Sequence, residues 1–268
     1  ACLDNISVIW SGFDLITKYI PMYFRLLETG KSSAAMNMAI DEAVMLGRAP
    51  TLRFYGWEPR AVSIGYFQGI EQEVDLERCA QLGVDVVRRL TGGGAVYHDR
   101  ELTYSFILPE DGPVARNILE SYGQICRPIT EGLKRLGLET EFKPINDIIV
   151  NGRKISGNAQ TRRGGMILQH GTIILDVDVK RMFSLLKVPD EKIRDKMISV
   201  VGERVTSVSK ELSGAISFDE VKKALIEAFK QESYIRELTP GKLSEAELSK
   251  AEELSKSKYG TREWNFMR

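Results

Sequence analysis

The chain has 268 residues, and its 37 Lys and Arg side chains balance 37 Asp and Glu, for a formal net charge of zero. This balance excludes a nucleic-acid partner bound mainly by charge, and 43% hydrophobic residues exclude a disordered chain. No apolar run approaches the ~18 residues of a membrane span, so we expect no membrane partner. Three scattered cysteines are typical of a reducing compartment, so we expect a cytoplasmic protein.

The N-terminal half is expected to alternate strands with helices. Residues 1–22 lack the features of a signal peptide and form an extension of unknown role. A helix is predicted over residues 34–46, after two serines that can cap it. The patterns also predict strands at residues 22–27, 51–55, 61–65, 84–89 and 102–108, the second and third forming a hairpin-like pair.

The C-terminal half becomes increasingly helical. Apolar residues at steps of three and four predict a helix over 117–136. Asn151-Gly152 predicts a tight hairpin, which places Lys154 on a short strand just after the turn. A strand is expected at 167–175, a helix at 177–186, and capping boxes begin helices at Ser217 and Ser244. The whole pattern predicts an α/β fold.

The densest chemical signal is the glycine-rich connection between the strands at 84–89 and 102–108. It runs Arg89, Leu90, Thr91, Gly92, Gly93, Gly94, Ala95, Val96, Tyr97. Consecutive glycines let backbone N–H groups turn toward an anion such as a phosphate, and Arg89 can add a fork of donors. A plain flexible turn is the alternative, but the flanking arginines favour an anion cradle.

The second signal is the run from Asn146 and Asp147 to Lys154 and Gly157. A lysine on a rigid hairpin can stabilise negative charge that develops where a carboxylate attacks a phosphate. Asp147 could orient that lysine or hold Mg²⁺, and no other metal site is expected. The alternatives are a surface lysine and a turn aspartate.

The histidines and cysteines carry weaker signals. His98 and His170 are candidate pocket residues together with Asn146 and Thr172, although a lone histidine is more often structural. No motif that would activate a thiolate lies beside Cys79 or Cys126, and with Cys2 the cysteines are too scattered for a disulfide framework.

These segments together resemble the lipoate-protein ligase A family, within the wider biotin and lipoate ligase and octanoyltransferase fold. The resemblance covers residues 23–264 and depends on four motifs in order: Arg-Arg-Leu-Thr-Gly-Gly-Gly-Ala-Val-Tyr-His-Asp, Asn-Asp, Gly-Arg-Lys-Ile-Ser-Gly-Asn-Ala and Gln-His-Gly-Thr. It implies an α/β (α+β) catalytic domain over 23–268, with mixed sheets flanked by helices.

The resemblance also implies an activity. Members activate lipoate with ATP and Mg²⁺ to lipoyl-AMP, then transfer the lipoyl group to a lysine of a lipoyl carrier domain. The carriers are those of 2-oxoacid dehydrogenase E2 components or the glycine cleavage H protein. By resemblance, Arg89 and residues 94–97 contact the nucleotide, and Lys154 contacts both the acyl carboxylate and the α-phosphate.

Two rival functions stay open. An octanoyltransferase of the same fold works through a cysteine thioester, but the branch most similar to this chain has its cysteine just before Asn146, where this chain has none. A non-catalytic lipoate or acyl-carrier binding protein is the other rival. A biotin ligase is disfavoured because its Gly-Arg-Gly-Arg-type loop is missing.

One departure concerns the end of the chain. Single-chain ligases of this family carry a C-terminal accessory domain, and the sequence has no segment that matches it after Trp264. We therefore expect the large subunit of a two-component, archaeal-type ligase with a separate small accessory subunit.

Overall fold

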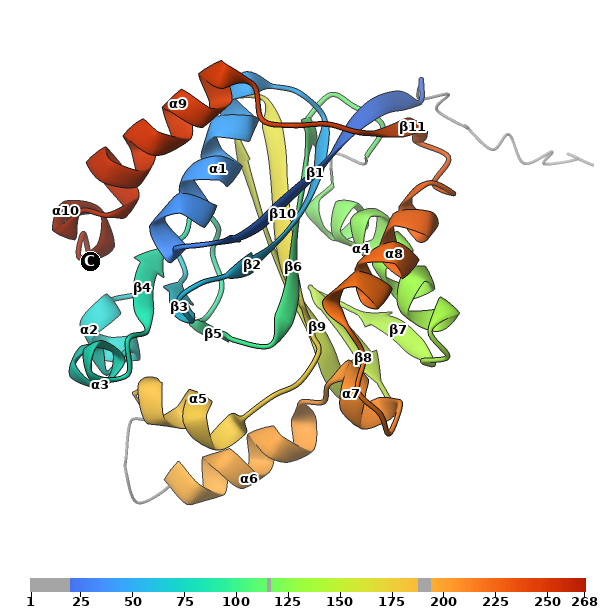
Figure 1. Ribbon diagram of the computed structural model, residues 1–268. Coiled ribbons are helices and arrows are strands. Elements are labelled where there is room, and N and C mark those ends of the chain that lie inside the picture. The colour runs from blue at the N-terminus through green and yellow to red at the C-terminus, as the bar shows by residue number, and fades with distance from the viewer. Residues whose placement is uncertain (1–19, 115–116, 188–193) are drawn as a thin grey trace, which may run out of the picture.

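The structure is a computed structural model that describes residues 20–114, 117–187 and 194–268. Its centre is an eight-stranded mixed sheet in the order β11-β1-β2-β6-β10-β9-β8-β7 (Figure 1). The strands of this sheet are β1 (Met22–Ser32), β2 (Thr51–Trp57), β6 (Glu101–Pro109), β7 (Thr140–Lys143), β8 (Asp147–Val150), β9 (Arg153–Arg163), β10 (Met166–Ile174) and β11 (Ile235–Pro240). Strand β1 runs parallel to both β2 and β11, and the other neighbours are antiparallel.

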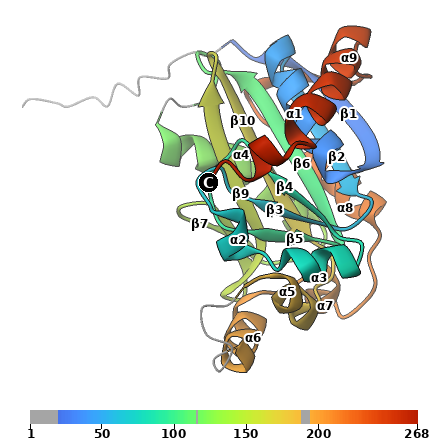
Figure 2. The same ribbon diagram turned by 90° about the vertical axis from the view of Figure 1, so that its left-hand side faces the viewer.

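A second sheet of three strands lies beside the first, as Figure 2 shows. It consists of β3 (Ala61–Ile64) between β4 (Asp85–Arg88) and β5 (Val96–His98), with β3 parallel to β4 and antiparallel to β5. The predicted hairpin of β2 with β3 is therefore wrong. Both strands are buried along their whole length, so neither has the alternating pattern that would have revealed its partner.

Two pairs of helices cover the two faces of the large sheet (Figure 1). Helices α4 (Ile118–Arg135) and α8 (Phe218–Phe229) bury their apolar stripes against one face, around Phe24 and Phe106. Helices α1 (Ala34–Gly47) and α9 (Glu245–Leu254) cover the other. The predicted caps form: Ser33 caps α1, and Ser217 and Ser244 make capping boxes.

Seven further helices complete the described part of the chain. They are α2 (Ile70–Glu73), α3 (Leu76–Gln81), α5 (Val179–Leu185), α6 (Arg194–Arg204), α7 (Val208–Glu211), η2 (Ser255–Tyr259) and α10 (Arg262–Asn265). The predicted α/β fold of mixed sheets flanked by helices is confirmed. No helix in the described part of the chain is both long and apolar enough to cross a bilayer.

The Asn-Gly turn forms as predicted. Asn151 and Gly152 adopt φ angles of 49° and 74°, and β8 pairs antiparallel with β9 across the turn. The strand that follows is longer than expected, because β9 has 11 residues and pairs with β10 along most of its length. Lys154 therefore lies near the start of a long, well-anchored strand.

Candidate functional site

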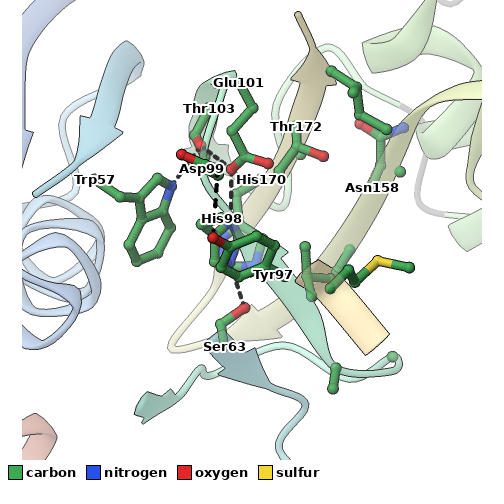
Figure 3. A pocket seen from close by; sticks show the side chains of 18 of the residues that line it. Trp57, Ser63, Tyr97, His98, Asp99, Glu101, Thr103, Asn158, His170 and Thr172 are labelled. Carbon is green, nitrogen blue, oxygen red and sulfur yellow. Dashed lines mark hydrogen bonds and ion pairs between the residues drawn. The ribbon is translucent and has the colours of Figure 1, made fainter. Parts of the chain in front are cut away.

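A cavity of about 280 Å³ lies between the two sheets (Figure 3). Side chains from β2, β3, β5, β6, β9 and β10 form its wall, with α1 and α5 contributing Met38 and Met182. Its lining brings together most of the predicted site residues: Arg89, Gly93, Gly94, Ala95, Val96, Tyr97, His98, Asn146, Lys154, Gly157, His170 and Thr172. Thr91, Gly92 and Asp147 do not line it. Gly92 and Asp147 are next in sequence to lining residues, and Thr91 is hydrogen-bonded to the lining residue His170.

The glycine-rich loop joins β4 to β5 and packs closely on the end of β3. A Cβ atom at Gly65 would lie 2.0 Å from the carbonyl oxygen of Gly93, so only glycine allows this approach. Gly93 itself has a φ of 95°, in the region that favours glycine. The backbone amides of Gly93 and Gly94 donate to no described residue. The loop thus offers free N–H groups at the cavity.

Arg89 holds this loop in place. Its five N–H groups donate within the chain, to the carbonyls of Gly92, Gly94 and Ser63 and to the hydroxyls of Ser63 and Thr91. Burial lowers the pKa of Arg89 to about 10, which leaves the guanidinium charged at neutral pH. Arg89 therefore supplies a fixed positive charge at the cavity wall and fixes the loop's shape.

Arg88 points elsewhere. Its buried guanidinium donates to the backbone carbonyls of two segments. These are the turn after β3, at Gly65, Tyr66 and Gln68, and helix α10, at Trp264 and Asn265. It ties the C-terminal segment to the small sheet and does not line the cavity. The sequence predicted both arginines at an anion cradle, and the structure places only Arg89 at the cavity.

Lys154 is held at the cavity by its neighbours. Its Nζ lies 2.6 Å from Oδ1 of Asp147, and a Cβ at Gly157 would lie 2.8 Å from the same Nζ. The carbonyl of Lys154 accepts from the amide of Thr206 at 2.8 Å. Asp147 therefore forms an ion pair with Lys154, as one of the two roles predicted for it requires, and Gly157 leaves the lysine room.

Two asparagines brace the same wall. The side-chain amide of Asn158 donates to the carbonyl of Asn146 at 2.9 Å, and its Oδ1 accepts from the Tyr104 hydroxyl at 2.7 Å. A Cβ at Gly171 would come within 2.1 Å of that Oδ1, so the glycine of the Gln-His-Gly-Thr motif makes space for Asn158. Asn158 was not singled out from the sequence, although it lies in the Gly-Asn-Ala motif.

His98 is the centre of a buried hydrogen-bond chain (Figure 3). Its Nε2 lies 2.7 Å from the Ser63 hydroxyl, and its Nδ1 lies 2.5 Å from Oε1 of Glu101. Glu101 also accepts from Thr103, which accepts in turn from the indole N–H of Trp57. All five side chains line the cavity. Ser63, Glu101, Thr103 and Trp57 were missed, because residues on four strands, β2, β3, β5 and β6, had to meet.

His170 is the centre of a second chain. Its Nε2 lies 2.7 Å from the Thr91 hydroxyl and its Nδ1 lies 3.3 Å from Asp41, which forms a fully buried ion pair with Arg53. Burial lowers the pKa of His170, outweighing the opposite effect of Asp41, so the imidazole is neutral at pH 7. This chain anchors the glycine loop to β10 and α1.

Neither described cysteine lies in the cavity lining. Cys126 is buried in α4, and burial raises the pKa of its thiol to about 12. Cys79 is buried in α3 with its pKa raised to about 11, also by burial. Both are therefore inert thiols at neutral pH. Cys2 lies outside the described residues.

The carboxylates of the site offer little to a metal ion. No group of three or more His, Cys, Asp or Glu side chains able to hold a metal occurs among residues 20–114, 117–187 and 194–268. Asp147, the predicted Mg²⁺ ligand, is paired with Lys154. The residues present do not fit a resident magnesium site.

Known proteins resemble this chain over nearly all of its length. It is 41% identical to octanoyltransferase LipM of Kyrpidia tusciae, over 91% of this chain and 98% of the relative. It matches the structure of a bi-partite lipoate protein ligase of Thermoplasma acidophilum with a TM-score of 0.83 and 36% identity, over 91% and 96% of the two chains. The structure of a lipoate-protein ligase A bound with ATP matches with a TM-score of 0.79 and 34% identity, over 91% of this chain and 99% of that one.

These relatives correct the function expected from the sequence. Eight curated relatives, at 34–41% identity, are octanoyltransferases. The prediction of an ATP-dependent lipoate ligase as the main activity is therefore wrong, and the rival activity is the better supported one. The chain matches an octanoyltransferase and a lipoate protein ligase over 91% of its length, so its motifs do not distinguish the two activities.

Both a family model and individual relatives establish the family of this chain. The lipoyl protein ligase A/B catalytic domain model matches residues 33–230, more than half of the chain, and contains the whole cavity lining. The relatives extend the match beyond that range on both sides. The chain is an enzyme that belongs to the lipoyl protein ligase A/B catalytic domain family.

Proposed function

We propose that this protein transfers an octanoyl group to a specific lysine of a lipoyl carrier domain. The observation that carries the proposal is the 41% identity with an octanoyltransferase over 98% of that relative's length. A structural relative is described together with an E2 lipoyl domain, which supports a lipoyl domain as the acceptor. The catalytic domain is proposed to span residues 23–268.

The cavity suits this reaction. Met38, Tyr55, Trp57 and Met182 give it apolar wall area for an eight-carbon chain. Lys154 and the loop amides supply positive charge and donors where the acyl carbonyl becomes an oxyanion. The donor is an octanoyl thioester, which is already activated, so neither ATP nor a separate accessory subunit is part of the proposal.

The test compares two donors with the same purified chain and a lipoyl domain. With an octanoyl thioester of acyl carrier protein and no nucleotide, mass spectrometry should show one octanoyl group on the lipoyl domain. Modification that occurs only with free octanoate or lipoate plus ATP and Mg²⁺ would overturn the proposal.

Matched lysine variants locate the site. Lys154→Met removes a charge that stabilises the oxyanion and should lower the transfer rate by roughly 10²-fold. Lys256→Met changes an exposed lysine on η2, outside the cavity lining, and should leave the rate unchanged. Equal rates for the two variants would separate Lys154 from the reaction.

A further inference from the structure

Transfer from a thioester to an amine proceeds either directly or through a nucleophile of the enzyme. The described cysteines are inert and lie outside the cavity lining, as shown above. Ser63, by contrast, lines the cavity with its hydroxyl within hydrogen-bond distance of a histidine. This side chain is the best-placed hydroxyl for an acyl-enzyme.

The hydrogen bonds between Ser63, His98 and Glu101 assign the proton on the imidazole of His98. The Glu101 carboxylate accepts hydrogen bonds only, so the 2.5 Å contact places a proton on Nδ1 of His98. Nε2 is then unprotonated, and it accepts from the Ser63 hydroxyl at 2.7 Å. Figure 3 shows the three side chains in this order, from β3, β5 and β6. A nucleophile, a base and a group that orients the base are thus in line.

The surroundings hold this arrangement rigid. The Trp57 ring stacks on the imidazole of His98, with ring centroids 4.0 Å apart and planes inclined by 16°. The Thr103 hydroxyl donates to Glu101 at 2.9 Å, and the Trp57 indole donates to Thr103 at 2.8 Å. The three side chains are shielded from bulk solvent, since Ser63, His98 and Glu101 are 2%, 4% and 8% exposed.

A fixed positive charge lies beside the serine oxygen. Nη1 of Arg89 is 3.2 Å from Oγ of Ser63 and 3.1 Å from the serine's carbonyl oxygen. This charge favours negative charge on Oγ during attack. The free amides of Gly93 and Gly94 lie on the same cavity and can accept the carbonyl oxygen of the substrate.

The second histidine chain provides an internal comparison. Thr91, His170 and Asp41 repeat the same order of hydroxyl, imidazole and carboxylate. Thr91, however, is fully buried and does not line the cavity. Only the Ser63 chain joins this geometry to a space where substrate can bind.

We propose that Ser63 carries the acyl group between donor and acceptor, with His98 as general base and acid and Glu101 as a positioning residue; this rests on the proposed octanoyl transfer. The Ser63 oxygen attacks the thioester carbonyl, its proton passes to His98, and the C–S bond breaks as the leaving thiolate takes that proton. The acceptor lysine's amine then attacks the serine ester, and the proton it loses passes through His98 back to the Ser63 oxygen as the C–O bond breaks.

The experiment traps the intermediate. Wild-type protein is mixed with octanoylated acyl carrier protein without a lipoyl domain, and the modified residue is located by peptide mass spectrometry. We expect one octanoyl group on Ser63 that disappears when lipoyl domain is added. Ser63→Ala should lose both the adduct and transfer, and His98→Gln should slow formation of the adduct.

Three further variants exclude a merely structural effect. Ser63→Cys should restore the adduct as a thioester, which also decides the matter if Ser63→Ala does not fold. Ser121→Ala removes a buried hydroxyl on α4 outside the cavity lining and should behave as wild type. Glu101→Gln should slow adduct formation and shift its pH profile.

The outcomes separate the two proposals. Wild-type transfer without an adduct, with Ser63→Ala equally active, would overturn the serine intermediate and leave octanoyl transfer standing. An adduct on a cysteine would overturn it too. Failure of the wild type to use any octanoyl thioester would instead refute the proposed function.

Discussion

Asp41→Asn tests the buried ion pair that lies behind the site. Asp41 and Arg53 are 2% and 0% exposed, and Oδ1 of Asp41 lies 2.6 Å from Nη1 of Arg53. Burial by itself would raise the pKa of Asp41, but Arg53 and His170 together hold it below its ordinary value, so the carboxylate is charged. The variant leaves the guanidinium buried without its counter-charge.

The expected cost follows from that geometry. Removing one partner of a buried pair typically costs about 3–5 kcal/mol of unfolding free energy. Arg53 keeps neutral hydrogen bonds to Asn37 and Thr29, so we expect the lower end, about 3 kcal/mol. Urea denaturation of both proteins measures the difference directly.

A double-mutant cycle and an exposed pair complete the test. Arg53→Met should be similarly destabilising alone, but combined with Asp41→Asn it should cost far less than the sum, because no unpaired charge remains. Glu227→Gln breaks an exposed pair with Lys230 and should cost less than about 1 kcal/mol. Additive costs in the cycle, or a loss below about 1 kcal/mol for Asp41→Asn, would refute the reasoning.

Three further predictions concern the loop, a histidine and a helix cap. Gly65→Ala forces the Gly93 carbonyl to move and should cut the rate of acyl transfer by roughly 10²-fold. The control Gly202→Ala adds a methyl group in open space on α6 and should leave the rate unchanged. Equal rates for the two variants would contradict the close contact of Gly65 with Gly93. Burial lowers the pKa of His170, so the unfolded chain binds a proton at this histidine more readily than the folded chain does. The stability that the neutral imidazole contributes should therefore be full above pH 6.5 and decline below it. Urea titrations at several pH values should show a flatter decline for His170→Gln. An identical pH slope in both proteins would exclude this role. Ser217→Ala removes the cap of α8 and should cost about 1 kcal/mol by thermal unfolding, with an unchanged Tm counting against the capping box.

Local patterns predicted what depends on a few neighbouring residues. The Asn-Gly turn, the serine caps and the apolar stripe of α4 each follow from a short segment, and each forms in the structure. The glycine loop and Lys154 could also be identified, because their motifs are contiguous. The choice between ligase and octanoyltransferase could not be made from these motifs, because the chain that carries them is similar to proteins of both kinds.

The sequence by itself determined the order of the elements, the fold class and the position of the glycine loop and Lys154. Only the tertiary structure decided that β2 and β3 part into two sheets, which opens the cavity between them. It also separated Arg89 from Arg88 and brought Ser63 to His98, 35 positions apart. Strands that are buried throughout carry no alternation to show their partners, so such contacts are set by long-range packing.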